Sequence, residues 1–286
     1  MSFKEQLKDL VGPAWRRRVH RLSRLRWATK LQIARGLQGG DRSLRRRAAY
    51  VLWDPETESF SYELADEGEL VAGIAQALGA DIDQLAGYAR ETHSDPELHD
   101  RLAHHLRWRF DVKHRPPLGH RLGWYVIARA LKPAVIVETG IYDGLGSLAL
   151  LRAIERNAAE GAPGELMAFD LSPDAGSLVR QAARGDWRPR VGSTRELLEP
   201  ALEGRQVGLM IQDTPHDDEN QRFEFGATLA HAAGRLVLVD GSGGWAKTLP
   251  ALCAERGGSH DLIPARSRDH VSPGATLSIG VFDTGP

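Results

Sequence analysis

The sequence predicts an α/β fold with one mostly parallel sheet and helices on both faces. From residue 134 onward, short β-branched apolar runs alternate with helical patterns at regular spacing. Such alternation requires crossover helices that cover both faces of a parallel sheet. The last two apolar runs, 261–265 and 275–282, follow each other without a long helix between them. This close spacing predicts one antiparallel strand near the C-terminus.

The expected elements follow in order along residues 116–286. Strands are expected at 134–138, 166–170, 189–192, 207–212, 235–240, 261–265 and 275–282. Helices are expected at 120–131, 145–157, 174–183, 194–202, 219–232 and 245–256. Seven strands in this pattern are typical of a Rossmann-like sheet.

Residues 1–115 are predicted to form a basic, mostly helical N-terminal region. Residues 1–50 contain fourteen Lys and Arg but three Asp and Glu, although the formal net charge of the whole chain is −1. Arginines alternate there with apolar residues, which predicts a basic amphipathic helix. Such a helix packs on its own protein, self-associates, or binds a membrane or nucleic acid. We expect a homo-oligomer formed through this region and no binding of nucleic acid.

Further patterns divide the rest of this region. The Asp54-Pro55-Glu56 turn between two aromatic-rich runs predicts a small hairpin over residues 50–64. Helical patterns follow at residues 67–79, 85–88 and 98–108.

Composition and the termini suggest a cytoplasmic protein. The sequence contains no run of eighteen apolar residues, so stable membrane insertion is not expected. The N-terminus lacks the apolar core of a signal peptide. Cys253 is the single cysteine, which excludes an intrachain disulfide and favours a reducing compartment.

The segment 135–147 holds the main functional motif. An apolar run ends at Glu138, and Gly140, Gly144 and Gly146 follow before a helical pattern. Glycines let the backbone adopt positive φ and let a ligand approach closely, and a helix N-terminus offers free N–H groups. The motif therefore predicts a nucleoside-cofactor site, although an ordinary strand–helix connection would look similar. The G-x-G-x-x-G order of NAD-dependent dehydrogenases is missing.

Polar residues follow the other expected strands as well. Acids end the first, second, fourth and fifth strands, and a small polar cluster ends the third; these are Glu138, Asp170, Asp213, Asp240 and Gly192-Ser193-Thr194. Any one of them could be a helix cap or a solvated loop residue. Ligands bind outside the carboxyl ends of strands in open α/β sheets, so we expect the group to line one site.

These motifs resemble the class I S-adenosylmethionine-dependent methyltransferases. The glycine turn is similar to that of the catechol, caffeoyl-CoA and macrocin types of O-methyltransferase, and the resemblance covers residues 116–286. It implies S-adenosylmethionine as cofactor, with Glu138 and Gly140 at the methionine end, Asp170 at the ribose and Ser193 near the adenine. The full set of implied cofactor-binding residues is Glu138, Thr139, Gly140, Asp143, Gly144, Ser147, Asp170, Ser172, Ser193 and Asp213.

The resemblance also implies the catalytic residues. An acid followed three residues later by histidine is frequent after the fourth strand of the family, and Asp213-Thr214-Pro215-His216 matches. We expect Asp213 and His216 to assist proton removal from an acceptor hydroxyl on a small molecule, such as a natural product. His216 could instead make a structural hydrogen bond. His114, His120 and Arg121 are second-choice substrate contacts.

The fifth strand ends in Asp240-Gly241-Ser242, whereas two metal-binding polar residues are common there in the family. This departure removes one ligand, so no metal site is predicted. If magnesium is bound, Asp213 and Asp240 are the alternative ligands.

Two other functions fit part of the pattern. A nucleic-acid methyltransferase would suit the basic N-terminus, but the Asn/Asp-Pro-Pro-aromatic motif for amino-group methylation is missing after the fourth strand. Cys253 lies in an expected helix and is not preceded by proline, so a core position is expected. A non-catalytic methyltransferase-like protein with a basic recruiting arm is the other alternative.

Overall fold

A computed structural model describes residues 62–106, 118–176, 179, 187–214, 217–241, 247–268 and 274–284 of the chain. All of them belong to one compact unit, Glu58–Pro286. None of the helices in these segments has the length and apolar character that a bilayer crossing requires.

The centre of the unit is a seven-stranded sheet in the order β3-β2-β1-β4-β5-β7-β6. Its strands are β1 Val135–Thr139, β2 Glu165–Asp170, β3 Arg190–Val191, β4 Val207–Gln212, β5 Ala232–Asp240, β6 Ser259–Arg266 and β7 Gly274–Asp283. Strands β1 to β5 pair in parallel, and β7 is antiparallel to both of its neighbours. The chain reverses direction across the sheet between β1 and β4, and ligands of open α/β folds bind at such a switch point.

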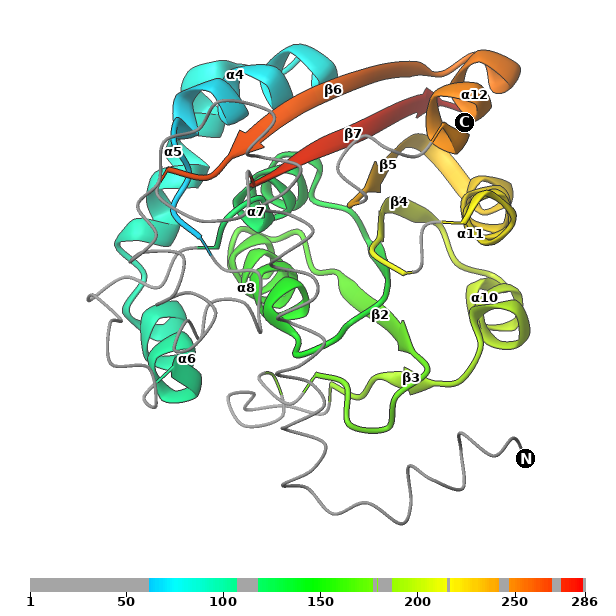
Figure 1. The fold of residues 1–286 in the computed structure, drawn as a ribbon, viewed down its shortest axis with the longest axis horizontal. Coiled ribbons are helices and arrows are strands. Elements are labelled where there is room, and N and C mark those ends of the chain that lie inside the picture. Colours follow the sequence, from blue (N-terminus) through cyan, green and yellow to red (C-terminus); the bar gives the residue numbers. More distant parts are fainter. Residues whose placement is uncertain are drawn as a thin grey trace, which may run out of the picture. The chain divides into compact units, whose positions relative to one another are not determined.

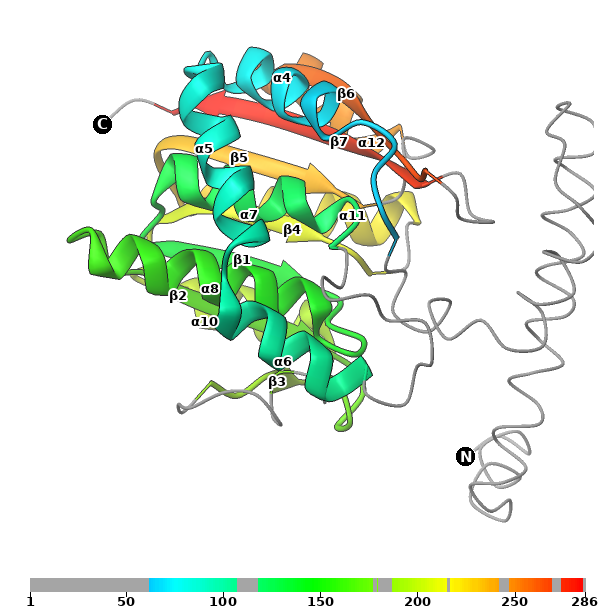
Figure 2. The same cartoon turned by 90° about the vertical axis from the view of Figure 1, so that its left-hand side faces the viewer.

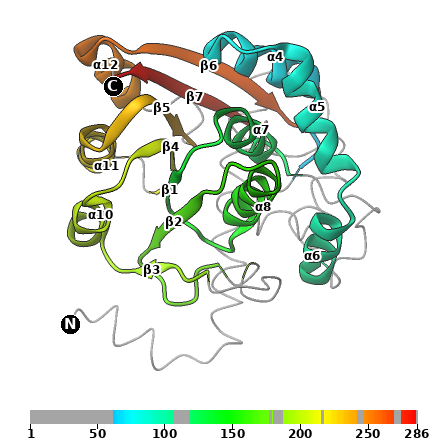
Figure 3. The same cartoon turned by 180° about the vertical axis from the view of Figure 1, so that it is seen from behind.

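Helices cover both faces of the sheet, as Figures 1 and 3 show. One face carries α4 Glu67–Leu78, α5 Ile82–His93, α7 Arg121–Leu131 and α8 Leu145–Ala159. The other face carries α10 Thr194–Leu202, α11 Asp218–Ala230 and α12 Thr248–Arg256. Helix α6, Pro96–Leu106, follows α5 and lies beside α8 (Figure 2). The expected three-layer α/β fold with one antiparallel strand is therefore confirmed.

The expected and observed elements agree within a few residues wherever both are described. The helix expected at 194–202 begins and ends at those residues, and Ser193 caps its N-terminus by accepting from the amide of Arg195. Strand β5 begins three residues earlier than expected. Most of the helix expected at 174–183 and of the hairpin expected at 50–64 lies outside the described residues.

The described end of that hairpin pairs with the edge of the sheet. Leu64 forms an antiparallel bridge with Ser267, and the amide of Ala65 donates to the carbonyl of Arg266 at 2.8 Å. Helices α4 and α5 share the apolar core of α7, α8 and the sheet. These residues therefore pack on the sheet itself, and a division of the chain at residue 115 stays a prediction.

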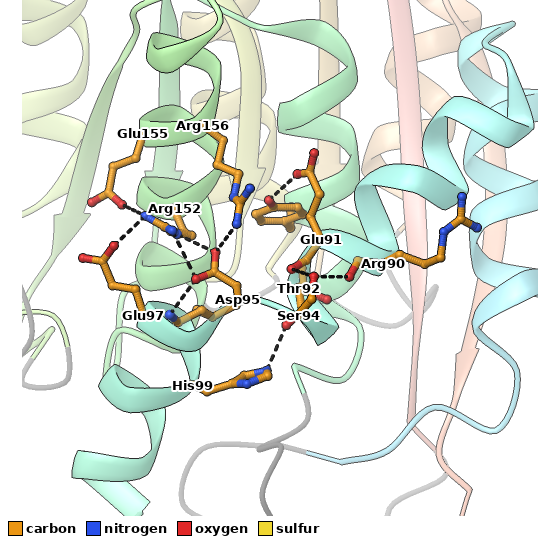
Figure 4. Close-up of polar contacts among 12 residues, drawn as sticks. Arg90, Glu91, Thr92, Ser94, Asp95, Glu97, His99, Arg152, Glu155 and Arg156 are labelled. Atoms are coloured by element: carbon orange, nitrogen blue, oxygen red, sulfur yellow. Dashed lines mark hydrogen bonds and ion pairs between the residues drawn. The ribbon is translucent and has the colours of Figure 1, made fainter.

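A buried carboxylate fixes the corner between α5 and α6 onto α8 (Figure 4). Asp95 is 1% exposed and accepts from Arg152 Nε at 2.6 Å and from Arg156 Nη2 at 2.9 Å. Its side chain also caps α6 by accepting from the amide of Leu98. Desolvation opposes charge on Asp95, but the two arginines outweigh it and lower the pKa of the carboxyl to about 2.

Candidate functional site

Strand β1 sends alternate side chains into the two layers of helices. Ile136 belongs to the core formed with α7 and α8, whereas Val137 belongs to the core formed with α10 and α11. Successive side chains of a strand point to opposite faces. Glu138 accordingly meets α8, and Thr139 meets α11. The two polar residues that end β1 therefore serve different layers.

The turn after β1 requires glycine. Gly140 has φ of +84°, and a Cβ on it would lie 2.2 Å from the carbonyl oxygen of Asp213. The backbone passes this closely because the amide of Asp213 donates to the carbonyl of Thr139 at 2.8 Å. The amide of Gly140 donates to the carbonyl of Phe169 at 2.9 Å. These bonds join the carboxyl ends of β1, β2 and β4 at the switch point.

Glu138 is a buried acid at the centre of this edge. It is 1% exposed and accepts a hydrogen bond from the hydroxyl of Ser147 on α8. A Cβ on Gly146 would lie 2.7 Å from its Oε1, so the helix can approach only because that residue is glycine. Burial raises the pKa of Glu138 to about 8, against the Ser147 hydrogen bond, and the nearby charge of Asp213 raises it further.

Asp170 holds the glycine turn in place. Its Oδ2 accepts from the amides of Ile141 at 2.9 Å and Tyr142 at 3.0 Å, and its Oδ1 accepts from the amide of Ser172 at 2.8 Å. Tyr142 has φ of +53°, a backbone conformation that residues other than glycine rarely adopt. A carboxylate offers about four acceptor positions, so Asp170 keeps capacity for one further donor, such as a hydroxyl.

Asp213 lies opposite the start of α7. Its Oδ2 is 3.9 Å from Arg121 Nη2, and the Arg121 side chain is 6% exposed. The guanidinium of Arg121 also lies over the ring of Trp124, 5.4 Å from the centroid. Arg121 is thus fixed by packing and lies near Asp213, and its expected role as a second-choice substrate contact stays a prediction.

The remaining expected site residues have local structural roles in the described residues. Asp143 Oδ1 accepts from the amide of Leu145 at the start of α8, at 3.1 Å. Ser172 Oγ accepts from the amide of Asp174 at 3.2 Å, and Ser193 caps α10. Asp240 is fully buried at the end of β5. His216 and His114 lie outside the described residues, so their expected roles stay predictions.

Glu224, Gln212 and Trp124 lie at this edge and were not expected from the sequence. Glu224 accepts hydrogen bonds from Thr139, Thr194 and Thr214, and Gln212 donates to Thr214. Trp124 packs beside Gly146 of the glycine motif. No short motif predicts these contacts, because they depend on how α7 and α11 lie on the sheet.

A separate cavity of about 230 Å³ adjoins the first turn of α7. Its lining includes Tyr62, Glu67, His93, Gly119 and Leu122. Glu67 lies 3.0 Å from Nε2 of His93, so this carboxylate of the lining already has a partner. The hydroxyl of Tyr62 lies 3.2 Å from Nδ1 of His120 and thereby connects the cavity wall to α7. The glycine turn and the strand-end acids lie outside this lining.

Among the described residues, no group of three or more His, Cys, Asp or Glu side chains converges as a metal site. The alternative ligands Asp213 and Asp240 follow neighbouring strands, since β4 pairs with β5. They do not supply a third ligand of these types in the described part of the chain, so metal binding is not supported by the donor set.

The glycine turn and the strand-end acids lie within one matched stretch. Residues 137–241 match the family model described as a methyltransferase domain. The resemblance to the class I methyltransferases is thereby confirmed. The match begins inside β1 and ends directly after β5, so the matched stretch contains every strand end of the candidate site.

Solved methyltransferases are similar in structure at low sequence identity. The O-methyltransferase TomG from Streptomyces achromogenes, in complex with SAM, is 16% identical, with 67% of this chain and 91% of that chain covered and a TM-score of 0.48. An O-methyltransferase from Bacillus cereus in complex with SAH is 14% identical, with coverages of 69% and 97% and a TM-score of 0.48. The SAH-bound methyltransferase PaMTH1 from Podospora anserina is 18% identical, with coverages of 68% and 93% and a TM-score of 0.45. No curated protein sequence matches the chain significantly.

Proposed function

We propose that the chain transfers a methyl group from S-adenosylmethionine to a hydroxyl group of a small molecule. The observation that carries the proposal is the glycine turn between β1 and α8, flanked by Glu138 and Asp213, inside a matched methyltransferase domain. When bound, the cofactor supplies an electrophilic methyl group on a sulfonium centre.

The residues present fit such a cofactor. Gly140 leaves the backbone bare where a Cβ would collide, so a ligand can approach the turn closely. Glu138 and Asp213 supply two carboxyl groups at this edge, and a cationic methionine end would favour their ionised forms. Asp170 keeps one acceptor position for a ribose hydroxyl while it holds the turn. Thr139, Asp143, Gly144, Ser147, Ser172 and Ser193 complete the proposed cofactor side.

For the acceptor, the chain must align a hydroxyl with the methyl group, exclude water and accept a proton. Asp213 is the proposed proton acceptor, because it ends β4 at the same edge and its side chain is 27% exposed. Arg121, at the start of α7, is proposed to orient the carboxylate of Asp213. His216 is proposed as its partner in proton removal. A natural-product hydroxyl is the proposed acceptor group, and no metal is required.

Isothermal titration of the protein with S-adenosylmethionine tests the cofactor. We expect saturable binding, with Asp170→Ala weakening it; no heat of binding in either protein would sink the proposal.

Methyl-labelled cofactor then tests the acceptor class, when it is added with fractionated bacterial extract. Label in the small-molecule fraction supports the proposal, and label confined to RNA or DNA would contradict it.

The proposed setting is a cytoplasmic homo-oligomer that assembles through the basic N-terminal region. Deleting residues 1–48 and measuring the mass in solution tests this assembly. A monomer after the deletion and an oligomer before it would support the proposal, and equal subunit numbers would contradict it.

A further inference from the structure

One side chain connects three separate strand ends of the candidate site. Glu224 lies on α11, is fully buried, and accepts from three threonine hydroxyls. Thr194 Oγ1 donates to its Oε1 at 2.7 Å, and Thr139 Oγ1 and Thr214 Oγ1 donate to its Oε2 at 3.0 Å each. Helical spacing puts Glu224 on the inner face of α11, with Gln221, Phe225 and Thr228 buried beside it.

Each threonine is the chain neighbour of a proposed cofactor residue. Thr139 lies between Glu138 and Gly140, Thr194 follows Ser193, and Thr214 follows Asp213. The three come from the segments after β1, β3 and β4, which are far apart in sequence. A single carboxylate therefore forms hydrogen bonds with the segments proposed for the methionine, adenine and acceptor sides of the site.

The hydrogen bonds leave this network little freedom to rearrange. The hydroxyl of Thr214 donates to Glu224 and accepts from Gln212 Nε2 at 2.6 Å and Asn220 Nδ2 at 3.2 Å. A hydroxyl has one donor and two acceptor positions, so that of Thr214 is fully used. Gln212 Oε1 in turn accepts from Gln221 Nε2 at 3.1 Å. The donor and acceptor roles in this network are consequently fixed by several partners together.

Burying a carboxylate costs folding free energy unless its partners compensate. Among the described residues, hydroxyl groups supply the hydrogen bonds to Glu224, and no lysine or arginine forms an ion pair with it. An apolar side chain of the same volume would avoid the desolvation cost of the carboxylate, but it would form no hydrogen bond with any of the three segments. The three hydroxyl hydrogen bonds therefore compensate for the buried carboxylate and also join the three segments to α11.

We propose that Glu224 is a positioning residue, which sets the loops after β1, β3 and β4 in the arrangement that binds the cofactor. The inference rests on the proposed function for its ligand, but its structural part can be tested without one. Glu224→Gln keeps the shape of the side chain and replaces an accepting oxygen by an N–H donor group, so at least one threonine loses its acceptor.

The first measurement is amide hydrogen exchange in the ligand-free protein. We expect Glu224→Gln to speed exchange at Gly140 and Asp213, whose amides bond across the strand ends, by about tenfold. Amides inside the sheet, such as those of Ile136 and Leu209, should exchange at unchanged rates. The second measurement is calorimetric affinity for S-adenosylmethionine, which should weaken about tenfold.

Glu219→Gln is the matched control, because Glu219 lies on the same helix and its side chain is 85% exposed. Its exchange and affinity should stay within about twofold of the wild type. Unchanged exchange at Gly140 and Asp213 in Glu224→Gln overturns the positioning role, and so does unchanged affinity. If the wild type itself fails to bind the cofactor, the proposed function fails and the exchange data still decide whether Glu224 orders the three segments.

Thr194→Val serves as a second variant if Glu224→Gln does not fold. It removes one donor from the carboxylate and leaves the other two hydrogen bonds in place. We expect a smaller change of the same kind, with faster exchange at Leu197, whose amide bonds to the carbonyl of Ser193. Wild-type exchange and affinity in a folded Thr194→Val would overturn the proposal.

Discussion

Oδ2 of Asp213 lies 3.9 Å from Nη2 of Arg121, so the end of β4 faces the first turn of α7. The two residues are 92 positions apart in sequence, and only the packing of α7 across the sheet brings them together. The ring of Trp124, one turn further along α7, lies against the guanidinium of Arg121 and packs against Gly146. The pair thus relates the acceptor side of the proposed site to the helix that precedes β1.

Asp213→Asn keeps the size of the side chain and removes its ability to accept a proton as a base. We expect turnover to fall about a hundredfold, a typical effect of losing a general base. Affinity for the cofactor should fall by less than about threefold, because Glu138 still supplies a carboxyl group beside the proposed methionine end. Single-turnover methyl transfer and calorimetry measure the two quantities. Loss of cofactor binding together with turnover would mean that Asp213 belongs to the cofactor side alone.

Glu138 should make cofactor binding depend on pH. Its pKa of about 8 in the free protein means that most molecules hold a proton on this acid at pH 6. A bound cation favours the carboxylate, so affinity should rise between pH 6 and pH 7.5, by up to about tenfold for each pH unit. Calorimetry in buffers of different ionisation enthalpy should show proton release on binding.

Glu138→Gln provides the control for this pH effect. The variant has no carboxyl to titrate, so its affinity should be weaker and should not change with pH over the same range.

The raised pKa of Glu138 also affects stability: the folded protein keeps a proton on this group that the unfolded chain releases above the ordinary carboxyl pKa. This group therefore lowers the free energy of unfolding as pH rises from about 4.5 toward 8. An equal pH slope in variant and wild type would exclude Glu138 as the titrating group.

Asp95→Asn should destabilise the protein without changing the site. It breaks a buried pair with Arg152 and Arg156, so we expect a loss of about 3 kcal/mol in the free energy of unfolding by urea. Asp95 has a lowered pKa, so its stabilisation is present above the ordinary carboxyl pKa and is lost as pH falls toward about 2. Glu97→Gln, with a side chain 47% exposed, should cost less than about 1 kcal/mol. A similar loss in both variants would contradict the role of burial.

Treatment with a chelator tests metal dependence. Because the described residues supply no converging group of three metal-binding side chains of these types, we expect turnover to be unchanged by EDTA and by added magnesium. Inductively coupled plasma analysis of the purified protein gives an independent reading. A chelator-sensitive activity that magnesium restores would instead assign Asp213 and Asp240 as ligands.

The sheet and most helix limits could be predicted because their causes are local. Apolar periodicity, proline and glycine positions, and the capping residue Ser193 act within a few residues, and the structure follows them. The candidate edge was also predictable, since parallel strands bring their carboxyl ends together. Asp170 could be placed at this edge, but its two hydrogen bonds from the turn after β1 could not, because they depend on the path of a neighbouring loop.

The sequence by itself determined which residues end the strands and that glycines follow β1, because chain order and backbone freedom are local properties. Tertiary structure alone decided what those residues touch. Alternation along β1 points Glu138 and Thr139 to opposite layers, but the docking of α8 gives Glu138 its burial and raised pKa. The docking of α11 likewise brings the carboxylate of Glu224 within hydrogen-bond distance of three threonine hydroxyls, since contacts between distant segments depend on how helices pack on the sheet.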